Sequence, residues 1–239
     1  MSFLKAEWRK LAIANFQVEP EILAKYLPFG TELDFREGKC FVSLVGFMFI
    51  NTKLLGIKIP YHVHFEEVNL RFYVKRWDGV SWKRGVVFVK EIVPKPALTF
   101  VANTIYKENY ETSKMKHMWS KDKEDLSVCY EWQKDSKWNK FCVSASTDLV
   151  NIASGSETEF ITEHYWGYAK ASEGQTVEYE VTHPRWNIYE VNDYNIAVDF
   201  ELVYGAEWSF LSNSEPVSVM LAEGSEITVE KNKKIKKSV

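Results

Sequence analysis

The chain is built mainly from short strand-like runs that are separated by charged turns. The runs occupy residues 40–50, 61–74, 86–93, 114–120, 126–133, 139–146, 165–171, 176–183, 195–203 and 216–230. Charged segments such as "KDKED" and "KDSK" separate neighbouring runs. Many strands joined in this way predict a mainly β fold with a few short helices, arranged as an antiparallel barrel or a sandwich. A barrel, closed or partly closed, removes the unpaired edges of a sheet and can enclose a central cavity.

Two segments carry helix signals within this strand-rich pattern. In residues 19–34, "EPEILAKYLPFGTELD", apolar residues recur at helical spacing, and Pro28 ends the predicted helix. Ser156, followed three residues later by Glu159, is a capping-box pattern that opens a second short helix. Residues 97–106, "ALTFVANTIY", fit either a helix or an irregular segment.

The domain organisation follows from the uniformity of the chain. The 239 residues show no internal repeat, no low-complexity linker and no break in composition. We therefore predict one β-barrel domain over residues 1–230. The remaining residues 231–239, "KNKKIKKSV", are predicted to be a basic, flexible tail.

Charge and cysteine usage limit the classes of partner and compartment. The net charge of −3 gives no long-range attraction to nucleic acid or an anionic membrane, and no apolar run resembles a signal peptide or a membrane span. Cys40, Cys129 and Cys142 are far apart and odd in number, so neither a disulfide framework nor a metal motif is predicted. These features favour a cytoplasmic protein with a small-molecule partner and no cofactor, and they leave a homo-oligomer open.

The run 61–74, "YHVHFEEVNLRFYV", places polar groups in line with aromatic ones. Phe65, Glu67, Asn69, Arg71 and Tyr73 share one face, because side chains alternate along a strand. If this face is buried, its polar groups must satisfy each other or a ligand, since unpaired burial costs several kcal/mol. Arg71 is within reach of Glu67, and its planar guanidinium also suits a carboxylate ligand. We expect a ligand-binding polar floor here; a surface ladder of charges is the alternative.

The opposite face of the same run holds a different candidate site. His62, His64 and Glu66 are spaced so that both imidazoles could reach one metal ion, with another histidine completing the site. The alternative is a solvent-side strand end with mixed polar residues. The sequence does not decide which face of the run points inward.

Two further segments contain candidate catalytic residues. Glu91 and Lys95 lie in "VKEIVPKPALTF", where a lysine would act as an amine nucleophile only if it were buried and dehydrated. His183 follows a strand in "EVTHPRWNIY" and could be a general base or a loop residue with a structural hydrogen bond. The chain contains no G-x-S-x-G motif, P-loop or dinucleotide fingerprint.

Several segments together resemble known proteins. "NFQVEPEILAKYLPFGTELD" is similar to the opening of acetoacetate decarboxylase-like proteins, and "FEEVNLRFYV" resembles the E-L-N-V-R-T-Y-V segment of the YqjF-like proteins, a bacterial family of unassigned function. "PALTFVANTIYKENY" keeps the leading proline and final tyrosine of that family, and "VTHPRW" resembles its H-x-x-W element. The resemblance implies an acetoacetate decarboxylase-like β-barrel with a central cavity.

The same resemblance tests the chain for the catalytic lysine of the decarboxylase. Its pattern is R-E, four residues, then P-K-K; here Lys90 and Glu91 stand for R-E and Pro96 for the proline. Ala97 and Leu98 occupy the positions of the lysine pair. Schiff-base catalysis needs an amine whose pKa is lowered from about 10.4, which a neighbouring cation and a dry pocket achieve. We therefore predict that the chain does not decarboxylate acetoacetate.

Three functional hypotheses follow. The leading one is a small-molecule-binding β-barrel for a small organic acid, or a similar apolar ligand with an anionic head. The second is a diverged lyase or hydrolase that uses Glu91, Lys95 or His183. The third is a metal-binding barrel through His62 and His64.

Overall fold

All fourteen strands join one sheet in the computed structural model, which describes residues 2–237. The strands are β1 (Leu4–Val18), β2 (Glu32–Leu33), β3 (Cys40–Leu54), β4 (Phe65–Trp77), β5 (Trp82–Val93), β6 (Tyr110–Thr112), β7 (Met115–Lys121), β8 (Asp125–Lys134), β9 (Lys137–Asn151), β10 (Trp166–Ser172), β11 (Gln175–Thr182), β12 (Asn187–Ala197), β13 (Ser218–Val229) and β14 (Lys233–Lys236). The helical elements are α1 (Pro20–Ala24), α2 (Pro96–Val101), the π-helical turn η1 (Ala102–Tyr106), α3 (Glu157–Thr162), α4 (Phe200–Tyr204) and the 3-10 segment η2 (Ala206–Asn213).

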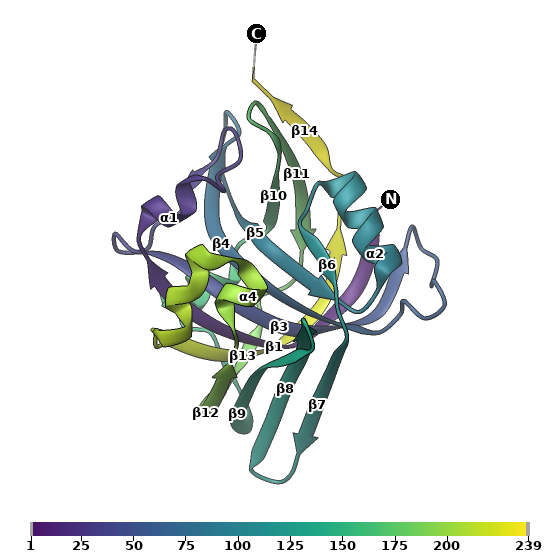
Figure 1. The fold of residues 1–239 in the computed structure, drawn as a ribbon, viewed down its shortest axis with the longest axis vertical. Coiled ribbons are helices and arrows are strands. Elements are labelled where there is room, and N and C mark those ends of the chain that lie inside the picture. Colours follow the sequence, from purple (N-terminus) through teal and green to yellow (C-terminus); the bar gives the residue numbers. More distant parts are fainter. Residues whose placement is uncertain (1, 238–239) are drawn as a thin grey trace.

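Part of the sheet closes into a ring. Its strands follow the order β11-β10-β5-β4-β3-β1-β13, and β13 pairs back to β11 at Val181↔Val229 and Thr182↔Thr228. Beyond β13 the sheet continues through β12, β9, β8 and β7, which project below the ring in Figure 1. The prediction of a mainly β, partly closed barrel with few short helices is confirmed. The sheet is mixed rather than purely antiparallel, because β5 runs parallel to both β10 and β6.

Strands β3 and β4 are buried on both faces because they separate two apolar cores. The inner core fills the ring and includes Val45, Phe47 and Phe65. The outer core includes Leu44 and Leu70, and it is covered by β8 and β9 together with α1 and α4, which lie on one side of the ring in Figure 1. This arrangement explains why residues 40–50 are almost continuously apolar.

The helix predictions agree with the structure in position. Helix α1 begins at Pro20 and ends before Pro28. Helix α3 follows Ser156, whose hydroxyl accepts a hydrogen bond from the Glu159 backbone N–H at 3.1 Å. Residues 96–106 are helical through α2 and η1, which resolves the ambiguity between helix and irregular segment.

Two strand and tail predictions are wrong. The run 195–203 was expected to be one strand, but β12 ends at Ala197 and Phe200–Tyr204 forms α4. The side chain of Asp199 caps this helix by accepting a hydrogen bond from the Leu202 backbone N–H, a local interaction that competes with strand pairing. The tail was expected to be flexible, but Lys233–Lys236 forms β14 on the edge of β11. Residues 238–239 lie outside the described part of the chain.

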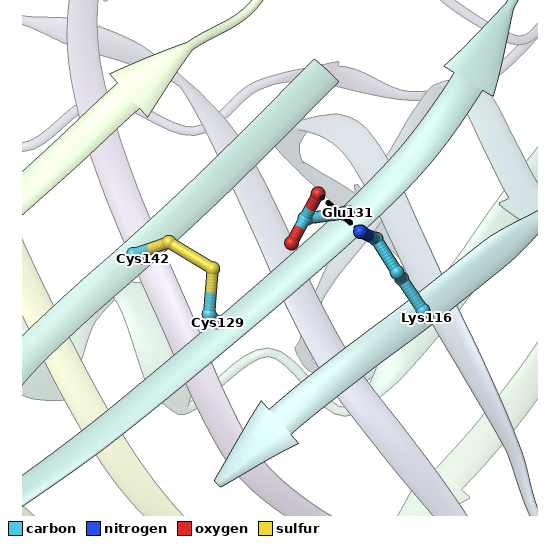
Figure 2. Close-up of a disulfide and its surroundings, with 4 residues drawn as sticks. All are labelled: Lys116, Cys129, Glu131 and Cys142. Carbon is cyan, nitrogen blue, oxygen red and sulfur yellow. Dashed lines mark ion pairs between the residues drawn. A yellow bond between two sulfur atoms is a disulfide. The ribbon is translucent and has the colours of Figure 1, made fainter. Parts of the chain in front are cut away.

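The expectation about cysteines is also wrong. Cys129 and Cys142 are directly opposite each other on β8 and β9 and form a disulfide, as Figure 2 shows. The hairpin brings them together although they are separated by 13 positions in the sequence. Figure 2 also shows Lys116 of β7 paired with Glu131 of β8 at 3.1 Å. Cys40 is free and buried. Because two of the three cysteines are bonded, cysteine usage does not favour a reducing compartment for this protein.

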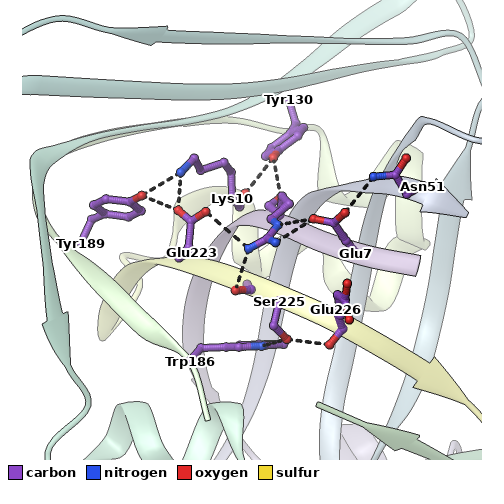
Figure 3. Close-up of polar contacts among 11 residues, drawn as sticks. Glu7, Lys10, Asn51, Tyr130, Trp186, Tyr189, Glu223, Ser225 and Glu226 are labelled. Carbon is purple, nitrogen blue, oxygen red and sulfur yellow. Dashed lines mark hydrogen bonds and ion pairs between the residues drawn. The ribbon is translucent and has the colours of Figure 1, made fainter. Parts of the chain in front are cut away.

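A polar network joins the ring to the projecting part of the sheet. Lys10, in a left-handed backbone conformation at a bulge of β1, donates to the Tyr189 hydroxyl at 2.7 Å and pairs with Glu223. The Tyr130 hydroxyl donates to the Lys10 carbonyl oxygen at 2.7 Å, so β8 is connected to the same point, as Figure 3 shows. The network fixes how β8 and β12 leave the ring.

No helix within residues 2–237 has the length and apolarity needed to cross a membrane.

Candidate ligand-binding site

The ring encloses a cavity of about 360 Å³. Its walls come from the inner faces of β1, β3, β4, β5, β10 and β11, and α2 and η1 contribute apolar residues. This volume lies within the range of small-molecule sites, about 300–1,000 Å³. The barrel therefore has room for a ligand of modest size.

The inward face of β4 is the one that carries Glu67, Asn69 and Arg71. All three are buried and line the cavity. Phe65 and Tyr73 point the same way and belong to the inner core beside the cavity. The structure thus decides between the two faces of this strand, because the outward face packs into the outer core beneath β8.

Glu67 makes its hydrogen bonds within the cavity wall. Its Oε1 accepts from Asn69 Nδ2 at 3.0 Å, and its Oε2 accepts from the Tyr110 hydroxyl at 3.1 Å. Burial raises the pKa of the Glu67 carboxyl to about 7. The expected pairing of Arg71 with Glu67 does not form; Asn69 and Tyr110 donate to the two carboxylate oxygens instead.

Arg71 is a buried cation that makes no ion pair with the described residues. Its side chain is 7% exposed, and no carboxylate of residues 2–237 lies within ion-pair distance of it. Its Nε has no hydrogen-bond partner in the protein, and its guanidinium lies 5.9 Å from the centre of the Tyr73 ring. A buried guanidinium in this state is costly, so it favours an anion from outside the chain.

Glu91 and Glu108 add two more carboxyls to the same cavity. Glu91 lies between Asn69 and Tyr110 in register across β4, β5 and β6, and its Oε2 has no partner in the protein. The pKa of Glu91 is raised well above its usual value, first by burial and then by the nearby Glu108 and Glu67 carboxyls. Burial also raises the pKa of Glu108 to about 8, although the Tyr179 hydroxyl donates to it at 2.8 Å.

His164 brings an imidazole to the cavity wall. Its Nε2 lies 3.1 Å from Oδ2 of Asp34, and the same oxygen accepts a hydrogen bond from Arg84 Nε at 2.6 Å. Burial lowers the pKa of His164 to about 4, so the ring is neutral at pH 7. Its Nδ1 is buried without a partner in the protein. A neutral imidazole held by a carboxylate can accept a proton or a hydrogen bond at Nδ1.

The sequence patterns predicted neither the pair of Asp34 and His164 nor the pair of Glu108 and Tyr179. His164 is one of the histidines that could complete the metal site of the third hypothesis, and Asp34 lies 130 positions away from it, so no local pattern joins the two. Glu108 and Tyr179 were not singled out, and they are 71 positions apart. The one available signal was the final tyrosine of "PALTFVANTIYKENY", which is Tyr110.

The candidate catalytic residues are separated by the fold. Glu91 lines the cavity, but Lys95 does not. Lys95 precedes α2, and its positive charge lies close enough to Glu66 to favour the ionised form of that carboxyl. Ala97 and Leu98 line the cavity in its place. Lys95 does not share the inward face of β5, because this strand ends at Val93 and Lys95 lies beyond it.

His183 also lies away from the cavity. Its ring stacks on Trp186 at 4.2 Å between centroids and contacts Tyr165, and its Nδ1 lies 2.9 Å from the Pro184 carbonyl oxygen. It borders an open groove on the surface beside Lys5 and Glu226. These contacts fit a loop residue with a structural hydrogen bond.

The three residues of the metal hypothesis do not converge. Strand β4 begins at Phe65, so His62 and His64 precede it in an irregular segment and lose the strand alternation. His62 lines the cavity, His64 is exposed, and Glu66 pairs with His117 at 2.7 Å. Within residues 2–237, no three histidine, cysteine or acidic side chains are close enough to hold a metal ion.

Comparison with known proteins adds the family and the fold. Residues 5–226 match the model of DUF2071, described as an uncharacterized conserved protein. The chain belongs to the DUF2071 family. A search of curated proteins finds no match.

Solved structures that resemble this DUF2071 protein share its fold at low sequence identity. Acetoacetate decarboxylase from Legionella pneumophila is 13% identical with a TM-score of 0.65, over 97% of this chain and 86% of that chain. An acetoacetate decarboxylase-like enzyme from Sphingomonas wittichii is 10% identical with a TM-score of 0.65, over 100% and 95%. The enduracididine biosynthesis enzyme MppR, in complex with pyruvate, is 10% identical with a TM-score of 0.65, over 98% and 90%. The acetoacetate decarboxylase-like fold is thereby established; the finer resemblance to YqjF-like proteins stays a prediction.

Proposed function

We propose that this DUF2071 protein binds a small organic acid in the ring cavity, with the acid's carboxylate against Arg71. The observation that carries the proposal is the unpaired, 7% exposed guanidinium on the cavity wall. A carboxylate can accept two parallel hydrogen bonds from a guanidinium, and both charges are then compensated in a site that excludes water.

The size and the walls of the cavity agree with such a ligand. Its volume of about 360 Å³ equals about a dozen water molecules at about 30 Å³ each. Phe47, Phe49 and Phe88 provide apolar wall, so the body of the ligand can be hydrocarbon. A compact acid with a short apolar body fits these constraints.

A structural relative supports the choice of an acid. MppR has been solved with pyruvate and with the condensation product of pyruvate and imidazole 4-carboxaldehyde. A protein with this fold can therefore hold a small 2-oxo acid. We include pyruvate among the probes for this reason.

Binding to a panel of acids tests the proposal. We expect butyrate and pyruvate to bind to the wild-type protein in isothermal titration calorimetry. Arg71→Met should weaken binding by about tenfold to hundredfold, because hydrogen bonds to a charged group contribute about 1.5–3 kcal/mol. Arg185→Met, which removes a guanidinium on the surface beside Glu159, is the matched control and should bind as the wild type does. Equal binding by both variants would refute the role of Arg71.

We also infer that the protein does not decarboxylate acetoacetate. Ala97 and Leu98 stand at the cavity where the family resemblance expects a lysine pair, and no lysine is among the cavity-lining residues of the described chain. Incubation with acetoacetate should release no carbon dioxide above background. Borohydride trapping with β-keto acids should give the same result for wild type and Lys95→Ala; an adduct that depends on Lys95 would contradict the inference.

A second candidate function is that of a lyase or hydrolase that uses Glu91. The supporting observation is that the Glu91 carboxyl borders the cavity, and burial raises its pKa well above the usual value, which favours the protonated form that can donate a proton. Lys95 and His183 receive no such support. Turnover of a bound acid that Glu91→Gln abolishes, without loss of affinity, would favour this candidate over simple binding.

A further inference from the structure

Two hydrogen-bond acceptors lack a donor near the middle of the cavity wall. Asn69 Oδ1 and Glu91 Oε2 are both buried and have no partner in the protein, and the two residues are in register on β4 and β5. Each lies on a side chain that lines the cavity. A carboxylate ligand would bring only further acceptors, whereas an ammonium group carries three donors and can satisfy both atoms.

The charge of the cavity also favours a ligand with a cationic group. Three carboxyls, those of Glu67, Glu91 and Glu108, line it against the single cation of Arg71. His164 is neutral at pH 7, because burial lowers its pKa to about 4. The hydroxyls of Tyr110 and Tyr179, which border the carboxyls, keep their protons, since burial raises their pKa values. A ligand that brings only a negative charge would be opposed by any ionised carboxyl in this group.

Aromatic rings surround the carboxyls and suit a cation. Tyr106, Tyr110 and Tyr179 line the cavity; Tyr110 and Tyr179 donate to Glu67 and Glu108, and the Tyr106 ring packs against Tyr179. The faces of such rings attract ammonium groups, and the attraction is larger where water is excluded.

The spacing of Asn69 and Arg71 along β4 indicates the length of the ligand. Asn69 and Arg71 are two residues apart on one strand, which separates their Cα atoms by about 6.6 Å at about 3.3 Å per residue. A ligand that meets both needs its cation and its anion separated by a few carbon atoms. We propose that the cavity takes a small aliphatic ω-amino acid, whose carboxylate meets Arg71 and whose ammonium meets Asn69 and Glu91. This inference rests on the proposed function, because Arg71 holds the carboxylate in both.

The proposal predicts a change in bound protons. Burial raises the pKa values of Glu67 and Glu108 to about 7 and about 8, so at pH 7 the empty cavity keeps Glu108 mostly protonated and Glu67 protonated in part, and burial also raises the pKa of Glu91 well above its usual value. An ammonium ion beside them favours the ionised form, and the displaced protons go to the solvent. A simple acid at Arg71 compensates that cation and has the opposite effect.

Calorimetry with three matched probes tests the inference. Butyrate, butylamine and 4-aminobutyrate are titrated at pH 7 in two buffers that differ in ionisation enthalpy. We expect 4-aminobutyrate to bind at least tenfold more tightly than butyrate and to release about one proton, seen as a binding enthalpy that depends on the buffer. Glu91→Gln should lose both the gain in affinity and the proton release, and a cooperative thermal unfolding transition shows that the variant is folded. Glu131→Gln, a surface carboxylate on β8, is the control and should behave as the wild type does.

The outcomes separate the two proposals. Butyrate binding that depends on Arg71, with 4-aminobutyrate no tighter or with proton uptake, would overturn the ω-amino acid and leave the proposed function standing. Failure of both butyrate and 4-aminobutyrate to bind would overturn both. Butylamine binding alone would show that the carboxyls recognise a cation without Arg71, and it would also overturn both proposals.

Discussion

Single residues decide what the cavity of this protein can recognise. Arg71 makes no ion pair with the described residues, and the two oxygens of Glu67 accept from Asn69 and Tyr110 instead. The sequence placed Glu67, Asn69 and Arg71 on one face from alternation alone, and the structure shows that this face lines the cavity. The sequence could not predict that His164 and Glu108 line the cavity, because their neighbours in space are far away in the sequence.

Gly167 is a residue at which one methyl group should disturb the cavity. A Cβ atom there would lie 2.1 Å from Cζ of Tyr179, whose hydroxyl donates to Glu108. We expect Gly167→Ala to lower the free energy of unfolding by about 1–3 kcal/mol, the usual cost of overpacking, because the buried ring must shift. Denaturant unfolding measures the change. Gly174→Ala is the control, since a Cβ there meets only Cβ of Lys237, at 3.7 Å, and it should leave stability nearly unchanged.

The sequence patterns predicted the type of several secondary-structure elements, but not where these elements begin and end. The apolar run at β3 and the capped helix α3 were predictable, because alternation and capping are local. The end of β12, the pairing of β14 and the start of β4 were not, since each depends on a neighbour that is distant in the sequence or on a competing cap such as Asp199. The late start of β4 is what disperses His62 and His64.

The β8–β9 hairpin gives a prediction at the scale of elements. Because Cys129 and Cys142 are bonded and Cys40 is not, we expect one thiol to react with an alkylating reagent in denatured, unreduced protein and three after reduction. Intact-mass spectrometry counts the labels. The double variant Cys129→Ala/Cys142→Ala should lose about 2–4 kcal/mol of unfolding free energy, the usual contribution of a disulfide. Three reactive thiols before reduction would contradict the pairing.

The whole molecule combines a ring that encloses the cavity with a projecting extension of the same sheet. The short β11–β13 contact of two residue pairs closes the ring and brings the inner faces of its strands together. The extension covers the outer faces of β3 and β4, and the network at Lys10 fixes its direction (Figure 3). Without the extension, the outward faces of these strands would expose a large apolar surface.

The buried carboxyls predict how the stability of the whole molecule depends on pH. The folded protein binds protons more tightly at these groups than the unfolded chain, because the pKa of Glu108 is about 8 against an ordinary 4.5, and that of Glu67 is about 7. Their contribution is therefore fully present below about pH 4.5 and is lost as the pH rises towards 8. His164 acts oppositely, since its pKa falls from 6.5 to about 4, and it destabilises the fold as the pH falls through that interval.

Thermal unfolding across this range measures the effect. We expect the melting temperature to fall between pH 6.5 and pH 8, where the carboxyls of Glu67 and Glu108 ionise and His164 no longer titrates. Glu108→Gln should flatten this fall, because an amide does not ionise. Glu131→Gln, on the surface of β8, should not flatten it. A melting temperature that rises with pH over the same interval would contradict the raised pKa values.

The sequence by itself determined the strand-rich class, the shared face of Glu67, Asn69 and Arg71, the capped helix α3 and the identity of Ala97 and Leu98 as residues without an amine. These features are local, because alternation, capping and residue identity act over a few positions. Only the tertiary structure decided which face of β4 points inward, that Arg71 makes no ion pair with the described residues, and that Glu91 and Glu108 share its cavity. Closure of the ring sets these relations between distant segments, and the low polarity inside it turns ordinary carboxyls into groups with raised pKa values.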